Sequence, residues 1–232
     1  MKKQICFPVR ERLKESVGFD RWEILNRFGE EANYGEIYSV CLKNNCDYVL
    51  KYLPFENENT EEAIVNEVNI QTQCSKFGLC LPVIDAWLCD KGGAIVMGKL
   101  DYTLANLFLL YKSDIVRNKI LQRMLFLIQT LHSHNFYHGD LHLNNIMVKV
   151  GNFDIDVEEN NDEDELYELY DYKYYFIDFG MGGIMNGNKS ENERRKYRDY
   201  SYAYDHLQDL EEEDPTLENT VQIMREFMEK FE

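Results

Sequence analysis

The spacing of apolar residues changes part-way along this chain of 232 residues, and that change limits the folds that it can adopt. Before Leu100, short runs of apolar and β-branched residues alternate with turn residues, a pattern typical of antiparallel strands. From Thr103 onward, apolar residues recur every three or four positions, which is the period of amphipathic helices. The sequence therefore predicts an α+β fold in which a strand-rich part precedes a helical part.

The expected boundaries follow from these two patterns. We expect an N-terminal extension over residues 1–18, a strand-rich domain over 19–98 and a helical domain over 99–232. The first domain is expected to hold one helix, which Thr60 can cap and which ends near Lys76. Its five strands are expected near residues 22–28, 37–40, 48–53, 81–88 and 94–100.

The second domain is expected to open with two helices, of which the second is long and mostly buried. Two short strands are expected to follow, near residues 146–148 and 174–177. The apolar positions of the two helices are Leu104, Leu107, Phe108, Tyr111, Ile115, Ile120, Met124, Leu127, Ile128 and Leu131.

Acidic residues outnumber basic residues and are concentrated in one segment. The formal net charge is −17, which disfavours bulk attraction to nucleic acid or to an anionic membrane and favours a basic protein partner. Residues 151–172 contain many acidic residues and no Lys or Arg. We expect a solvated insertion there rather than a calcium site, because the segment lacks the glycine and the ligand spacing of a calcium loop.

The cysteines and the lengths of the apolar runs indicate the cellular compartment. All six cysteines precede residue 90 and form no Cys-x-x-Cys pair, so a zinc site is not expected. No apolar run is long enough for a signal peptide or a membrane-spanning helix. Free thiols in a reducing compartment are the simplest explanation, so we expect a protein of the cytoplasm or nucleus without membrane insertion.

Two short motifs carry side chains that suit one kind of chemistry. Residues 138–145 read HGDLHLNN, which places Asp140 five residues before Asn145, and residues 178–180 read DFG. Phosphoryl transfer uses an aspartate that accepts a hydroxyl proton, together with an amide and a second carboxylate that hold divalent cations. Each motif alone is common by chance, and only their order and spacing make the prediction specific.

On these motifs the chain resembles the protein-kinase-like superfamily over about residues 24–210. The sequences HGDLH and IDFGMG are similar to those of haspin-like kinases and, most closely, of divergent kinases from large DNA viruses. The resemblance implies a two-lobed protein kinase-like fold, with a five-stranded β N-lobe and a shortened helical C-lobe, that uses ATP with Mg²⁺ or Mn²⁺. A viral kinase would act in the host cell cytoplasm.

The resemblance also assigns roles to individual residues. Asp140 is the expected catalytic base, and Asn145 and Asp178 are the expected metal ligands. Lys51, in the sequence VLKY, matches the strand lysine that contacts the nucleotide phosphates, and Glu67 is the helix glutamate expected to pair with it. A solvent-facing strand lysine is the alternative for Lys51, although its apolar neighbours disfavour it.

The glycine-rich loop matches the family pattern less well. Gly29, Gly35 and Ile37 are expected to cover the nucleotide, but Glu30 and Ala32 stand where the first two glycines belong. A carboxylate that faced the phosphates would repel them, so weak nucleotide affinity or an inactive pseudokinase remains an alternative.

The segment after the last expected strand of the first domain resembles the hinge that binds adenine. Met97 stands at the gatekeeper position, and the backbone groups of Gly98 and Leu100 are expected to bond the adenine edge. A simple strand end is the alternative.

Two residues beside Asp140 depart from the common kinase pattern. Gly139 replaces an arginine that normally pairs with a phosphorylated loop, so activity without loop phosphorylation is expected. His142 stands where many serine/threonine kinases carry a lysine, and a catalytic and a structural role are equally open for it.

The residues after Gly180 contain no Ala-Pro-Glu sequence, so much of the helical substrate platform is expected to be missing, and an activating partner protein could complete it. Asp205 is our first choice for a buried aspartate that ties a helix to the catalytic loop, with Asp199 and Asp209 as alternatives. A basic cluster over residues 194–198 favours an acidic or phosphorylated protein substrate, but pairing with neighbouring acids on the helix is the commoner explanation.

The function expected from the sequence is transfer of the γ-phosphoryl group of ATP to serine or threonine hydroxyls of proteins. Two alternatives remain: an aminoglycoside- or choline-type phosphotransferase that shares the HGD motif, and a pseudokinase that acts as an interaction module.

Overall fold

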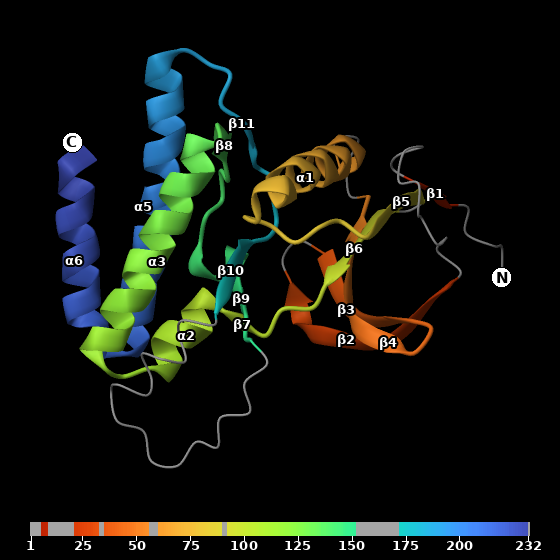
Figure 1. Cartoon of the computed structure of the whole chain (residues 1–232), viewed down its shortest axis with the longest axis horizontal. Helices are drawn as coiled ribbons and strands as arrows, with labels where there is room; N and C mark the ends of the chain where they lie inside the picture. The colour runs from red at the N-terminus through yellow and green to blue at the C-terminus, as the bar shows by residue number, and fades with distance from the viewer. Residues whose placement is uncertain are drawn as a thin grey trace. The chain divides into compact units, whose positions relative to one another are not determined.

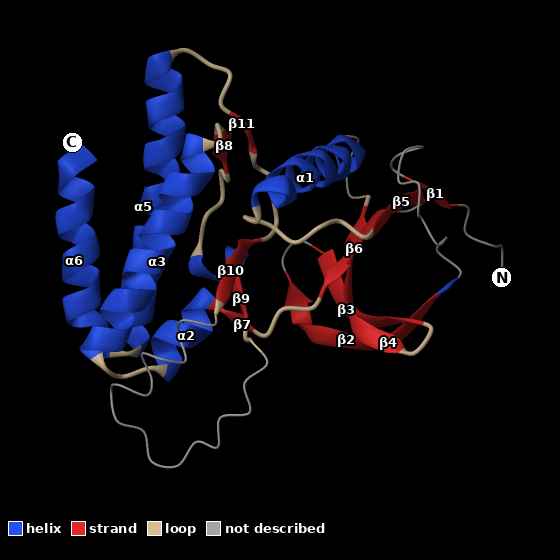
Figure 2. Ribbon diagram, viewed as in Figure 1, coloured by secondary structure: helices blue, strands red, loops and turns tan. Residues whose placement is uncertain are grey.

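The computed structural model describes residues 6–8, 21–32, 35–55, 60–89, 92–151 and 172–231. The chain forms two compact units, Met1–Lys99 and Leu100–Glu232 (Figure 1). Strands dominate the first unit and helices the second (Figure 2), so the predicted α+β class is confirmed. Among the residues described, no helix is both long and apolar enough to cross a lipid bilayer.

A six-stranded antiparallel sheet forms the framework of the first unit. In spatial order its strands are β1 (Cys6–Pro8), β5 (Asp85–Cys89), β6 (Gly92–Gly98), β4 (Asn45–Pro54), β3 (Gly35–Leu42) and β2 (Trp22–Ala32). The sequence predicted only the strands from β2 onward. Assigning Cys6–Pro8 to a loosely packed extension was wrong, because these residues pair with β5 at the sheet edge, a position that tolerates a proline.

Apolar side chains cover both faces of this sheet. Alternate residues of β6 belong to different clusters: Val96 packs with Trp22 and Leu50, whereas Ile95 packs on the face covered by α1 (Thr60–Cys74). The cluster on the α1 face comprises Ile64, Val68, Val83, Ala86, Ile95 and Met97. A lysine or glutamate that points between α1 and the sheet is therefore surrounded by apolar side chains.

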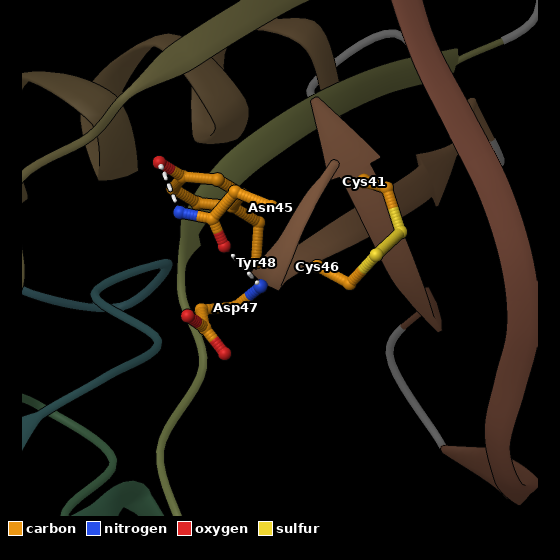
Figure 3. Close-up of a disulfide and its surroundings, with 5 residues drawn as sticks. All are labelled: Cys41, Asn45, Cys46, Asp47 and Tyr48. Atoms are coloured by element: carbon orange, nitrogen blue, oxygen red, sulfur yellow. Dashed lines mark hydrogen bonds between the residues drawn. A yellow bond between two sulfur atoms is a disulfide. The ribbon is translucent and has the colours of Figure 1, made fainter. Parts of the chain in front are cut away.

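A disulfide joins Cys41 to Cys46 across the hairpin of β3 and β4 (Figure 3). The turn residue Lys43 has a φ of 58°, and the backbone N–H of Asp47 donates to Asn45 Oδ1 at 2.9 Å. The expectation that all six cysteines are free thiols was therefore wrong. That expectation was the basis for inferring a reducing compartment, so the cysteines no longer support the inference.

The second unit contains α2 (Leu104–Leu110), α3 (Asp114–Ser133), α5 (Lys189–Glu213) and α6 (Glu218–Met228). One small sheet has the order β10 (Lys173–Phe176), β9 (Ile146–Lys149) and β7 (Tyr102–Thr103), and the other pairs β11 (Gly183–Ile184) with β8 (Phe136–Tyr137). The two helices predicted from the apolar period correspond to α2 and α3. Ile115 was expected in the core but is exposed, and Val116 is buried instead. The acidic insertion falls almost entirely outside the described residues.

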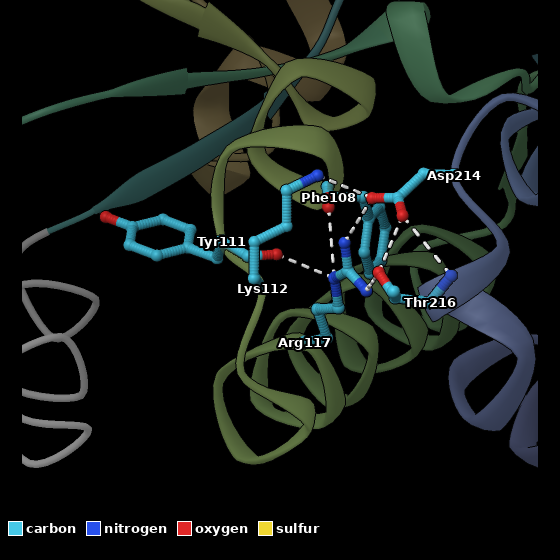
Figure 4. A network of polar contacts seen from close by, with 6 residues as sticks. All are labelled: Phe108, Tyr111, Lys112, Arg117, Asp214 and Thr216. Carbon is cyan, nitrogen blue, oxygen red and sulfur yellow. Dashed lines mark hydrogen bonds and ion pairs between the residues drawn. The ribbon is translucent and has the colours of Figure 1, made fainter.

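A buried arginine connects three parts of the second unit (Figure 4). The side chain of Arg117 on α3 is fully buried, and its Nε atom donates to the carbonyl oxygens of Phe108 and Tyr111 at 3.1 and 2.6 Å. Its two terminal nitrogens donate to Thr216 Oγ1 at 2.8 Å and to Asp214 Oδ2 at 2.7 Å. The guanidinium group thus ties the end of α2 and the connection between α5 and α6 to α3.

Candidate functional site

Lys51 and Glu67 form a buried ion pair within the first unit. Because Leu50 on β4 packs on the opposite face of the sheet, strand alternation turns Lys51 toward α1. The Lys51 Nζ atom donates to both carboxylate oxygens of Glu67, at 2.9 and 3.1 Å. The two residues are only 6% and 2% exposed. The predicted pairing is present, and the alternative of a solvent-facing Lys51 is excluded.

The residues expected in the glycine-rich loop lie on the hairpin of β2 and β3. Gly29 lies in β2, and Gly35 and Ile37 lie in β3. Gly35 has a φ of 116°, and a Cβ atom there would clash with the backbone of β4, so this position requires glycine. Residues 33–34 and the side chain of Glu30 are outside the described part of the chain, so the predicted repulsion of phosphate by Glu30 stays a prediction.

The expected hinge begins in the sheet of the first unit. Met97 is buried against the α1 cluster, and its Sδ atom accepts from Gln71 Nε2 at 3.7 Å. Gly98 is the last residue of β6, and Leu100 is the buried first residue of the second unit. The backbone at Gly98 therefore fits both the hinge and the simple strand end.

Asp199 of α5 holds the loop that follows β8. Its fully buried carboxylate accepts hydrogen bonds from the backbone N–H groups of His138 at 2.9 Å and Gly139 at 2.7 Å. His132 Nε2, from α3, lies 2.9 Å from the same carboxylate. Our first choice for this role, Asp205, was wrong, because Asp205 is exposed. Asp205 comes six positions after Asp199, which corresponds to about 1.7 helical turns, so the two aspartates face different sides of α5.

Gly139 is required by the path of this loop. Its φ is 81°, and a Cβ atom would clash with the carbonyl oxygen of Met181. An arginine at this position would need the backbone to move. The glycine is therefore explained by local geometry.

We predict that Gly139→Ala lowers the free energy of unfolding by about 3 kcal/mol, because a left-handed backbone costs a side chain about 1–2 kcal/mol and the clash adds to it. Gly78→Ala is the matched control, since Gly78 has a φ of 71° but its Cβ would meet nothing within 4 Å. Urea unfolding of both variants measures the difference. An equal loss of unfolding free energy in the two variants would show that the clash with Met181 adds no destabilisation.

Hydrogen bonds bring the three expected polar residues of the second unit into one region. Asn145 Nδ2 donates to the carbonyl oxygen of Asp140 at 2.9 Å. The backbone N–H of Ile177 donates to the carbonyl oxygen of Asn145 at 3.0 Å, and Asp178 follows directly. Asp178 has a φ of 61°, a left-handed conformation that aspartate and asparagine adopt more readily than other side chains.

The segment around Asp178 is anchored on His138. Phe179 is fully buried, and its ring centroid lies 4.8 Å from that of His138 and 6.3 Å from that of Phe176. His138 Nε2 lies 2.8 Å from the carbonyl oxygen of Ile177, which can only accept, so Nε2 donates. This packing fixes the backbone on both sides of Asp178.

Burial lowers the pKa of His138, and the nearby charge of Asp199 opposes this effect only in part. The unfolded chain therefore takes up the proton first, and stability falls as the pH drops from about 6.5 toward the folded pKa, by at most about 1.4 kcal/mol per pH unit. We predict that the free energy of unfolding, measured with urea, falls less between about pH 7.5 and about pH 5.5 in His138→Gln than in the parent. His134 is exposed, so in the His134→Gln control the free energy of unfolding should fall as much as in the parent. An identical fall in all three proteins would contradict the assignment of this pH dependence to His138.

His142 lies beside Asp140 and a second histidine. Its Nε2 atom is 4.0 Å from Asp140 Oδ2, too long for a hydrogen bond, and its ring centroid is 5.6 Å from that of His206 on α5. Burial and then the charge of His142 lower the pKa of His206, so the two imidazoles resist being charged together. Sequence reasoning missed His206, because nothing in its spacing links it to the HGDLH motif.

Helix neighbours neutralise much of the basic cluster on α5. Arg195 Nη2 pairs with Glu191 at 2.5 Å, and Lys196 Nζ pairs with Glu193 at 2.9 Å. Arg198 Nη2 donates to the hydroxyl of a tyrosine one turn away at 2.7 Å. The commoner explanation for this cluster, pairing within the helix, is confirmed for Arg195 and Lys196.

The expected metal ligands of the second unit are two residues, Asn145 and Asp178. Over the described ranges, no group of three or more His, Cys, Asp or Glu side chains is arranged to hold a metal ion. Magnesium is usually bound through one or two protein ligands together with water and substrate phosphates. Asn145 and Asp178 can supply two such ligands, because the hydrogen bond to Asp140 uses the amide nitrogen of Asn145 and leaves its oxygen.

A scan against protein-family models gives no match for the chain, and a search of curated proteins gives none either.

Proposed function

We propose that the chain is an ATP-dependent phosphotransferase with a two-lobed protein kinase-like fold, and that it phosphorylates serine or threonine hydroxyls of proteins. The observation that carries the proposal is the buried ion pair of Lys51 and Glu67. A buried ion pair gains little stability over apolar packing of the same volume. Its presence between α1 and the sheet favours a role in positioning a charged ligand.

The nucleotide would be held by the residues that the resemblance assigns. Lys51, kept in place by Glu67, would contact the phosphates, and Asn145 and Asp178 would hold Mg²⁺ or Mn²⁺. When bound, the ion would offset the negative charge of the phosphates. Asp140 would accept or orient the proton of the acceptor hydroxyl; its side chain is partly exposed and makes no hydrogen bond to His142.

The remaining assigned residues would contact the rest of the nucleotide. Gly29, Gly35 and Ile37 would cover the phosphates, and Met97, Gly98 and Leu100 would face the adenine.

The test is transfer of labelled phosphate from γ-labelled ATP, in the presence of Mg²⁺, to a basic protein, an acidic protein, an amino-alcohol and an amino sugar. We predict transfer to protein serine or threonine. Asp140→Asn should lower the rate by about 10²–10⁴-fold, the usual contribution of a positioned base. Asp205→Asn is the matched control, because Asp205 is an exposed carboxylate of the same unit and should leave the rate unchanged.

Each other outcome of this assay contradicts a defined part of the proposal. Transfer to the small molecules alone would favour an aminoglycoside- or choline-type phosphotransferase. Nucleotide binding without transfer to any acceptor would favour a pseudokinase.

A further inference from the structure

A pocket of about 410 Å³ lies on the second unit, apart from all residues assigned to nucleotide or metal binding. Five of its lining residues come from α3 and one comes from β10. They are Lys119, Gln122, Arg123, Phe126, Leu127 and Tyr174. The volume falls within the range of pockets that hold ligands.

Phe126 in the pocket lining and Ile115, outside the lining on the same helix, are exposed apolar side chains. Phe126 is 70% exposed, and Ile115, eleven residues earlier on α3, is 56% exposed. Eleven residues correspond to about three helical turns, so the two side chains share one face of α3. Large apolar side chains that share an exposed face mark an interaction surface more often than isolated ones do.

Tyr174 adds an unsatisfied polar group to the pocket lining. The residue is 8% exposed, and its hydroxyl oxygen is buried and has no hydrogen-bond partner among the residues that the structure describes. Burial raises the pKa of Tyr174 to about 12, so the hydroxyl keeps its proton and can act as a donor. Buried hydroxyl groups without a partner are uncommon in folded proteins, and a ligand acceptor would satisfy this one.

The charges around the pocket select an acidic ligand. Lys119 and Arg123 are one turn apart on α3, where like charges repel, and the Arg123 guanidinium lies 5.8 Å from the centre of the Tyr174 ring. In the described part of the chain, Lys119 has no ion pair. The Lys119 cation, beside an apolar pocket, is complementary to a carboxylate, whereas Arg123 Nη1 donates to the carbonyl oxygen of Tyr172 at 3.5 Å.

We propose that this pocket binds an acidic segment of a partner protein, with an aromatic or large aliphatic side chain packed on Phe126 and Leu127 and a neighbouring carboxylate near Lys119. The Tyr174 hydroxyl would donate to a carbonyl or carboxylate oxygen of that segment. This inference does not depend on phosphoryl transfer, because none of the proposed catalytic residues takes part.

Fluorescence anisotropy of a labelled short peptide, mixed with the full chain, tests the proposal. The peptide contains a single phenylalanine flanked by Glu and Asp. We expect saturable binding that weakens with added salt. Phe126→Ala and Lys119→Glu change exposed side chains, so the fold should persist, and each should weaken binding by about tenfold or more. Lys76→Glu makes the same charge change at an exposed position of the first unit and should change binding by less than about twofold.

Two control peptides complete the test. Replacing the phenylalanine by serine, or the acidic residues by lysine, should abolish binding. The proposal would be overturned by a lack of saturable binding, by equal binding of the lysine peptide, or by affinities that Phe126→Ala and Lys119→Glu leave unchanged. Sedimentation that showed self-association lost in Phe126→Ala would assign the surface to a second copy of the chain instead.

Discussion

Asp178→Asn is expected to lower phosphate transfer from ATP by about a thousandfold while the fold stays intact. The substitution removes the charge of a proposed metal ligand, and a thousandfold corresponds to about 4 kcal/mol of transition-state stabilisation. The backbone of Asp178 has a φ of 61°, which asparagine also tolerates. The change therefore separates metal binding from local strain better than an alanine would.

Initial rates at saturating Mg²⁺ and ATP, together with a thermal unfolding curve, measure both effects of Asp178→Asn. Asp205→Asn again serves as the control, because it removes an exposed carboxylate from the same unit. A variant that keeps the parent rate would show that Asp178 holds no catalytic metal. A variant that unfolds much earlier than the parent would point to a structural role.

Arg117→Met is expected to lower the free energy of unfolding by about 3–5 kcal/mol, the range for removing one partner of a buried ion pair. Methionine fills much of the same volume, and Asp214 Oδ2 keeps its hydrogen bond from Lys112, but the carbonyl oxygens of Phe108 and Tyr111 lose the Arg117 donor. Such groups are costly when they are left unpaired away from water. Urea unfolding of the full chain measures the loss.

Lys112→Met is the matched control for Arg117→Met. Lys112 pairs with the same oxygen of Asp214 at 2.6 Å, but its side chain is 63% exposed, so its loss should cost less than about 1 kcal/mol. Hydrogen bonds from Lys112, Thr216 and Arg117 hold the pKa of Asp214 well below its usual range. These hydrogen bonds to Asp214 therefore contribute to folding stability above about pH 4. Their contribution is lost only as the pH falls toward the lowered pKa of Asp214. Similar losses of unfolding free energy in Arg117→Met and Lys112→Met would contradict the conclusion that the burial of Arg117 makes its contacts important for stability.

Helices and strands whose apolar residues follow a regular spacing could be predicted from the sequence. The helices α2 and α3 follow from residues spaced by three and four, and the strands β2 to β6 follow from short β-rich runs between turns. The pairing of Lys51 with Glu67 was expected from the family resemblance, and Glu67 was chosen because it lies in the middle of the predicted helix. β1 was missed because three residues are too few to show a period.

Contacts between distant segments could not be predicted in the same way. The choice between Asp199 and Asp205 depends on which side of α5 faces the loop at His138, and the local pattern does not define that side. Arg117 is polar on a helix whose period is apolar, and only the fold supplies its acceptors. The disulfide did leave a signal, since Cys41 and Cys46 both lie between the strands predicted near residues 37–40 and 48–53.

A crystal structure of the full chain with Mg²⁺ and a non-hydrolysable ATP analogue would show where the phosphates and the metal ion bind. We predict that the phosphates contact Lys51 and that the metal ion is bound by Asn145 and Asp178. An analogue that binds away from Lys51, or a metal ion held by other residues, would contradict the proposed function.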